Sequence, residues 1–187
     1  MFLLLTAISI CYAYARLYLP YQEMRPDTVR LNDKILDSFP IRDLSTPIYI
    51  MIVLGPTLTG LELFYYVDFY AVEKFWFKYA LSTIIKSFTL YVTPLEVPEG
   101  YIALTDKISS HFTNNEIYGR DLFFSGHTTL MYLCFANSTN IYTSGFALLG
   151  LFSMVVSLMI NRVHYTIDIF IAPLIGYACH RFVECYI

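Results

Sequence analysis

Hydrophobic residues dominate six long stretches of the chain, and polar residues gather in the segments between them. These stretches cover roughly residues 2–20, 47–67, 71–92, 127–141, 143–161 and 165–184. Most approach the length of about 20 apolar residues that an α-helix needs to cross a bilayer, and none alternates strictly as a barrel strand does. The pattern therefore predicts an all-α polytopic membrane protein, folded as a six-transmembrane-helix bundle.

Two polar loops and several short turns connect these predicted helices. One loop covers residues 22–46 and the other covers residues 94–126, whereas the turn at 161–164 is short. Because each membrane crossing reverses the direction of the chain, both loops and this turn are expected on one side of the membrane. With no repeat or low-complexity linker between the helices, we treat residues 1–187 as a single membrane domain, and we expect the first stretch to be a retained helix.

Composition supports a membrane protein and argues against a nucleic-acid partner. The chain is 57% hydrophobic and only 14% charged, and its mean hydropathy is +0.54, which is more apolar than a soluble core of this size can hide. The net charge is −3 and there is no basic tract, so nucleic acid is not an expected partner.

The first polar cluster stands at the start of the fourth predicted helix, in the sequence DLFFSGHTTL at residues 121–130. Ser125 is placed to be the helix N-cap, and Gly126 allows the backbone to approach a ligand closely. A helix N-terminus favours phosphate because its free amides and dipole attract an anion. His127 would then stand in the first turn beside the anion and could protonate a leaving oxygen. Capping alone would also explain the cluster.

The second polar cluster, RVHYTID at residues 162–168, opens the sixth predicted helix. His164 and Asp168 are four residues apart and therefore share one helix face. A carboxylate on one imidazole nitrogen fixes the tautomer and stabilises positive charge, which makes the other nitrogen a nucleophile. The alternative is a pair that only satisfies itself inside the bundle.

Taken together, the two clusters predict phosphoryl transfer without a metal or other cofactor. Further positive charge for a phosphate is available from Lys86, Arg120 and Arg162. A zinc site formed by His127, His164 and Asp168 is the rival interpretation, but the basic neighbours would repel a cation.

These residues resemble the signatures of the sphingomyelin synthase family. The third signature, Cys-Gly-Asp, three residues and Ser-Gly-His-Thr, is similar to RDLFFSGHTTL (120–130), and the fourth, His-Tyr-Thr-x-Asp-Val, is similar to HYTIDI (164–169). KSFTLYVTPLEVP (86–98) resembles the second signature, and LNDKILD (31–37) faintly resembles the first. The departures are Gly119-Arg120 in place of Cys-Gly, Asn32 in place of Pro, and Ile169 in place of Val.

The resemblance implies a six-helix membrane enzyme of the type 2 phosphatidic acid phosphatase superfamily. Such an enzyme moves a phospho-headgroup, phosphocholine or phosphoethanolamine, from a glycerophospholipid to ceramide through a phosphohistidine and releases diacylglycerol. It also implies that His127, His164 and Asp168 are the catalytic triad on a lumenal or extracytoplasmic face. The positive-inside rule opposes that orientation, because most basic residues lie on the side of the clusters, and we follow the resemblance.

Further residues receive weaker predictions. Asp121 precedes the Ser-Gly-His turn and is expected in the substrate site, together with Tyr91 and Tyr165, which could contact a headgroup. Glu62 lies within the second predicted helix and should face the bundle interior, either to orient a histidine or to make a structural hydrogen bond.

The acceptor is the main open question at this stage. Ceramide or diacylglycerol as acceptor gives a phosphotransferase, whereas water gives a lipid phosphatase or a phospholipase C type hydrolase with the same residues. A membrane scaffold that merely retains the motif is disfavoured because all three triad positions are filled. Homo-oligomer formation is left open.

Overall fold

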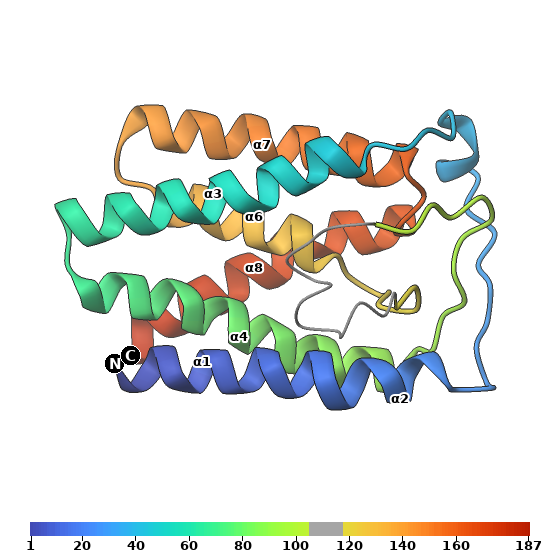
Figure 1. Ribbon diagram of the computed structural model, residues 1–187, viewed down its shortest axis with the longest axis horizontal. Helices are drawn as coiled ribbons and strands as arrows, with labels where there is room; N and C mark the ends of the chain where they lie inside the picture. The colour runs from blue at the N-terminus through green and yellow to red at the C-terminus, as the bar shows by residue number, and fades with distance from the viewer. Residues whose placement is uncertain (105–117) are drawn as a thin grey trace.

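A computed structural model describes residues 1–104 and 118–187, and within these ranges the regular structure is helical apart from one bridge between Val29 and Leu95 (Figure 1). The helices are α1 (Phe2–Ala13), the π-helical turn η1 (Tyr14–Tyr18), α2 (Leu19–Glu23), the 3-10 turn η2 (Leu36–Ser38), α3 (Ser45–Tyr66), α4 (Phe69–Val92), α6 (Gly126–Asn137), α7 (Ile141–Ile160) and α8 (Thr166–Tyr186). The all-α fold class is confirmed.

Four helical segments are long and apolar enough to cross a membrane: Phe2–Glu23, Ser45–Tyr66, Ile141–Ile160 and Thr166–Tyr186. Their outer faces expose large apolar side chains such as Leu149 (72%), Phe170 (64%) and Leu174 (67%), which suits lipid rather than water. The chain is therefore an integral membrane protein by helix length and surface.

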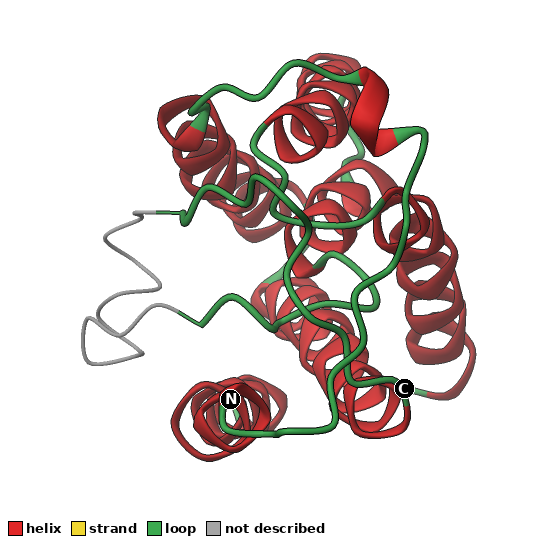
Figure 2. Ribbon diagram, turned by 90° about the vertical axis from the view of Figure 1, so that its right-hand side faces the viewer, coloured by secondary structure: helices red, strands yellow, loops and turns green. Residues whose placement is uncertain are grey.

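The count of six membrane spans stays a prediction, because α4 and α6 do not meet the same standard. With 12 residues and a rise of about 1.5 Å per residue, α6 is too short to cross the roughly 30 Å of a bilayer core. Within the described residues it packs against α3, α4, α7 and α8, so it lies inside the bundle (Figures 1 and 2). In contrast, α1 packs along α4 at the periphery (Figure 2).

Small residues let the neighbouring helices approach α6. Met131 of α6 fits between Gly55 of α3 and Gly150 of α7, where added Cβ atoms would lie 2.8 Å and 2.6 Å from its Sδ and Cε atoms. A Cβ on Gly176 of α8 would lie 2.7 Å from the ring of Tyr132. Close backbone approach at small residues is the usual way in which helices associate in lipid.

Charged residues inside the bundle have partners, which explains how α4 tolerates them. The buried Lys78 ammonium of α4 lies 2.5 Å from a carboxylate oxygen of Glu184 on α8. Glu62 of α3 accepts hydrogen bonds from the amides of Thr139 and Asn140 at 2.5 Å and 2.6 Å, just before α7 begins. Of the two roles predicted for Glu62, the structure therefore supports the structural hydrogen bond.

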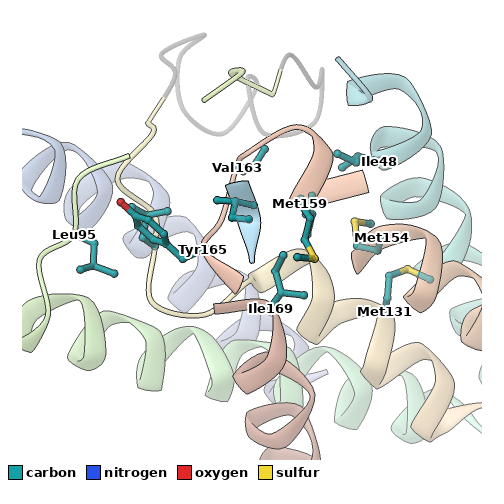
Figure 3. Packing of buried hydrophobic residues seen from close by; sticks show 11 residues of the cluster. Ile48, Leu95, Met131, Met154, Met159, Val163, Tyr165 and Ile169 are labelled. Carbon is teal, nitrogen blue, oxygen red and sulfur yellow. The ribbon is translucent and has the colours of Figure 1, made fainter. Parts of the chain in front are cut away.

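The first polar loop, residues 94–104 and 118–125 of the second, and the α7–α8 turn lie at one end of the bundle, and both chain termini lie at the other (Figure 1). The Asn161 side chain holds these segments together, since its Oδ1 accepts from the Leu44 amide at 2.6 Å and its Nδ2 donates to the Ile102 carbonyl at 3.1 Å. We call this end the loop end. Beneath it lies an apolar cluster, part of which is labelled in Figure 3: Leu36, Ile48, Leu95, Leu122, Met131, Met154, Leu158, Met159, Val163, Tyr165 and Ile169.

We predict that Gly176→Ala destabilises the bundle while the matched change Gly145→Ala does not. The new methyl at Gly176 would force the Tyr132 ring away, and overpacking of this kind costs about 1–3 kcal/mol. A Cβ at Gly145 meets nothing within 4 Å, and both glycines are helical. Thermal unfolding of the two variants in detergent measures the difference. Equal melting temperatures would show that the α6–α8 contact at Gly176 is not tight.

Candidate active site

A backbone hydrogen bond joins the start of α6 to the start of α8. The Ser125 amide donates to the carbonyl oxygen of Asp168 at 3.1 Å. The Ser125 side chain, as predicted for an N-cap, accepts from the Thr128 amide at 3.2 Å. Both polar clusters of the sequence are therefore fixed against each other at the loop end.

The two histidines face each other across this junction. The ring centroids of His127 and His164 are 6.4 Å apart, with 63° between the ring planes. Reacting atoms in a near-attack complex are about 3–3.5 Å apart, so a centroid separation of this size is compatible with one phosphorus atom between the two rings. His164 is 2% exposed, so little of this residue is open to solvent.

Asp168 orients His164 from the first turn of α8. Its Oδ2 atom lies 3.4 Å from Nδ1 of His164 and also accepts from the Tyr165 amide at 3.1 Å. The imidazole contact is long for a hydrogen bond, and catalytic hydrogen bonds commonly shorten when substrate binds. Asp168 is fully buried, so a positive charge on His164 would compensate a carboxylate that has no access to water.

Lys86 of α4 places a positive charge beside the Ser-Gly-His turn. A Cβ added to Gly126 would lie 3.7 Å from the Lys86 ammonium and 3.5 Å from the Tyr79 hydroxyl. Lys86 is 4% exposed, and its ammonium lies 2.7 Å from a carboxylate oxygen of Asp121. The Tyr14 hydroxyl donates to the same oxygen.

Asp121 is held in its charged form by this arrangement. Burial by itself raises the pKa of the Asp121 carboxyl, but the Lys86 ammonium, the Tyr14 hydroxyl and the charge on His164 together hold that pKa below its usual range. Asp121 is therefore a carboxylate at neutral pH, and with Lys86 it stands beside the start of α6.

The two predicted arginines lie in other ion pairs of the loop end. Arg120 lies 2.7 Å from a Glu96 carboxylate oxygen and also donates to two backbone carbonyls of the first loop. Arg162 lies 2.9 Å from an Asp37 carboxylate oxygen and is 7% exposed. Their part in phosphate binding stays a prediction.

The two predicted tyrosines have different surroundings. Tyr91 is 58% exposed, and the Arg25 guanidinium lies over its ring at 5.5 Å. Tyr165 is 1% exposed, and its hydroxyl donates to the Glu96 carbonyl at 2.8 Å. Tyr165 thus packs within the apolar cluster, and headgroup contact by either tyrosine stays a prediction.

Each cluster contains one residue with strained backbone, placed before its histidine. Phe123, just before the Ser-Gly-His turn, has a φ of 82°, and Arg162, two residues before His164, has a φ of 54°. Non-glycine residues with positive φ cost energy and concentrate at functional sites.

Two contacts of the site have no signal in the local sequence. Tyr14 reaches Asp121 from the π-helical turn η1, and such turns are frequent at functional sites. Asp33, which its position in the first loop predicts only as a loop residue, accepts from the Thr166 amide at 2.6 Å and so caps the start of α8. The sequence around Tyr14 therefore does not predict its contact with Asp121, and the π-helical turn that marks it is visible only in the structure.

Within residues 1–104 and 118–187, no group of three or more His, Cys, Asp or Glu side chains is arranged to hold a metal ion. The zinc interpretation therefore has no support from the described residues, and Asp168 is seen in contact with His164.

The geometry brings together a histidine pair, a carboxylate partner and a lysine at a helix start, which are groups able to act on a phosphate ester. Residues 120–185 match the family model described as PAP2 superfamily C-terminal, about a third of the chain. The match includes both histidines, and it supports the type 2 phosphatidic acid phosphatase superfamily, whose members are enzymes acting on phospholipid phosphate esters. No curated protein matches the chain in the comparison made.

We predict that Asp121→Asn lowers stability in a pH-dependent way. Unfolded aspartate titrates near pH 3.9, and a lower pKa in the folded state means that the stabilisation is fully present above that pH and is lost as pH falls through the folded pKa. At neutral pH the loss should be about 3 kcal/mol, because Lys86 stays buried without its carboxylate. Unfolding of both proteins between pH 3 and 7 measures it, and a difference that does not shrink at low pH would contradict it.

Proposed function

We propose that the protein is a lipid phosphotransferase of the sphingomyelin synthase kind, which moves a phospho-headgroup from a glycerophospholipid to ceramide. The observation that carries the proposal is the 6.4 Å separation of His127 and His164, with Asp168 behind the second ring. The match to the PAP2 superfamily model supports the reaction class and the membrane setting. The transfer to ceramide rests on the sequence resemblance.

In the first step the phosphate binds at the start of α6. The Gly126 amide and the helix dipole attract one phosphate oxygen, and the Lys86 ammonium lies beside the same position. Nε2 of His164 attacks phosphorus while Asp168 stabilises the growing charge at Nδ1. The bond from phosphorus to the diacylglycerol oxygen breaks, and His127 gives that oxygen its proton.

In the second step the phosphohistidine transfers its headgroup. Neutral His127 takes the proton of the primary hydroxyl of ceramide, and the hydroxyl oxygen attacks phosphorus. The bond from phosphorus to His164 breaks, which restores the free imidazole and the protonated His127. The products are diacylglycerol and a sphingophospholipid, and no cofactor is consumed.

A second candidate function is hydrolysis, in which water replaces ceramide in the second step and the protein acts as a lipid phosphatase or phospholipase C. The same residues serve both reactions, and the superfamily includes the phosphatase chemistry. Exclusion of water from the phosphohistidine favours transfer over hydrolysis. The deep burial of His164 therefore supports the transferase.

Site orientation is part of the proposal. We place the loop end on the lumenal or extracytoplasmic side, where the resemblance puts the catalytic face. Many of the basic residues there bind carboxylates, as Arg162 binds Asp37 and Arg120 binds Glu96. These ion pairs give the arginines a structural role at the loop end. That role does not depend on the orientation that the positive-inside rule predicts.

We predict that His164→Ala lowers turnover by about 10⁴-fold or more, because the nucleophile is lost, and that His127→Ala lowers it by about 10²–10⁴-fold. The measurement is diacylglycerol release from labelled phospholipid by purified protein. The matched control is His180→Ala, at the far end of α8, which should keep near-wild-type activity. Substantial activity of His164→Ala would show that the assigned roles are wrong.

Acceptor choice is measured in the same assay with and without ceramide. A transferase forms labelled sphingolipid in step with diacylglycerol and nearly stops without an acceptor. Release of free phosphobase at the same rate with and without ceramide would instead identify the hydrolase. Retention of activity after chelator treatment agrees with a metal-free site, and its loss would favour zinc.

A further inference from the structure

A polar cavity of about 370 Å³ opens at the loop end, beside the turn that carries His164. Its wall comes from the two polar loops and the α7–α8 turn, and it includes Arg30, Asn32, Asp37, Glu99, Arg162 and Tyr165. Small-molecule sites typically occupy about 300–1,000 Å³, so this cavity suits a compact polar group. Neither His127 nor His164 is among its lining residues, so it is separate from the space between the two rings.

Arg162 lines this cavity and carries several hydrogen-bond donors. Its side chain is 8% exposed, and one terminal nitrogen donates to Asp37 at 2.9 Å and to the Glu99 carbonyl at 3.2 Å. Its Nε atom is buried and has no hydrogen-bond partner among the described residues. A buried guanidinium with an unused donor and a φ of 54° is costly, which is typical of a residue retained for binding.

The same wall provides hydrogen-bond acceptors. Asp37 has a side chain that is 58% exposed and uses one oxygen for Arg162, which leaves acceptor capacity on both oxygens. Glu99 is exposed at the cavity rim. Donors and acceptors therefore stand side by side on the cavity wall.

A hydroxyl group fits such a wall better than the other common headgroup chemistries do. Each hydroxyl can accept from Arg162 and donate to a carboxylate, whereas an ammonium offers only donors and a phosphate offers mainly acceptors. A quaternary ammonium is usually held by several aromatic faces. Tyr165 is the single aromatic residue among the lining residues, and it is 1% exposed.

The cavity also lies where a headgroup would be. Arg162 and Tyr165 flank His164 in the chain, and two residues span at most about 7 Å. A donor lipid whose phosphate lies between the two histidines would keep its acyl chains in the membrane. Its headgroup would then project towards the loop end. We propose that this headgroup cavity binds a donor-lipid headgroup with several hydroxyl groups, of the inositol or glycerol kind. The inference rests on the proposed function and specifies its donor.

The test compares donor lipids and two cavity variants. Purified wild-type protein, Glu99→Gln and Asp37→Asn are assayed for diacylglycerol release from phosphatidylinositol, phosphatidylglycerol and phosphatidylcholine in mixed micelles. We expect the wild type to prefer a hydroxylated donor over phosphatidylcholine by at least about tenfold in kcat/KM, and each variant to reduce that preference about threefold to tenfold. Asp27→Asn, in the same loop but outside the cavity wall, is the matched control and should keep the wild-type preference.

The outcomes separate the two proposals. Equal use of all three donors by the wild type, or an unchanged preference in Glu99→Gln, overturns the headgroup cavity while the phosphotransferase stands. Glu99→Gln is informative even if Asp37→Asn fails to fold, because no ion pair of the described residues depends on Glu99. If no donor yields diacylglycerol, or if release survives His164→Ala, the proposed function fails and this inference fails with it.

Discussion

The hydrogen bond from the Ser125 amide to the Asp168 carbonyl is the contact on which the site depends. It joins the starts of two helices through the same residue whose side chain orients His164. The positions of the two histidines are therefore coupled through one residue. A shift of α6 relative to α8 would change the distance between the rings and the alignment of His164 together.

The bundle can hold this polar junction because α6 is enclosed. A 12-residue helix exposed to lipid would leave polar ends inside the bilayer, where unsatisfied backbone groups cost several kcal/mol each. Surrounded by α3, α4, α7 and α8, the same helix can place its N-terminus at the edge of the bundle and direct its dipole at a phosphate. The small residues Gly150 and Gly176 make this enclosure tight.

The sequence predicts those parts of the protein that depend on local spacing. The helical fold follows from apolar stretches, and the His164–Asp168 contact follows from a separation of four residues on one helix. The N-cap at Ser125 is likewise a local signal. What the sequence does not reveal depends on contacts between distant segments: Tyr14 reaches Asp121 across 107 positions, and Arg162 binds Asp37 across 125. No periodicity encodes such pairs. The sequence therefore predicts Arg162 as a phosphate ligand, although its guanidinium also binds Asp37 in the first loop.

For the reaction proposed above, the charge balance at the start of α6 would favour a phosphodiester over a phosphomonoester as substrate. Lys86 is neutralised by Asp121, so the positive potential left for a phosphate comes from the helix dipole and from His127 when it is protonated. A phosphodiester lipid carries one negative charge, whereas a monoester at neutral pH carries nearly two, as phosphoserine does. The second charge would stand near the Asp121 carboxylate and be repelled by it. A site built to cleave monoesters would need cations without a carboxylate partner, and Lys86, Arg120 and Arg162 all have one.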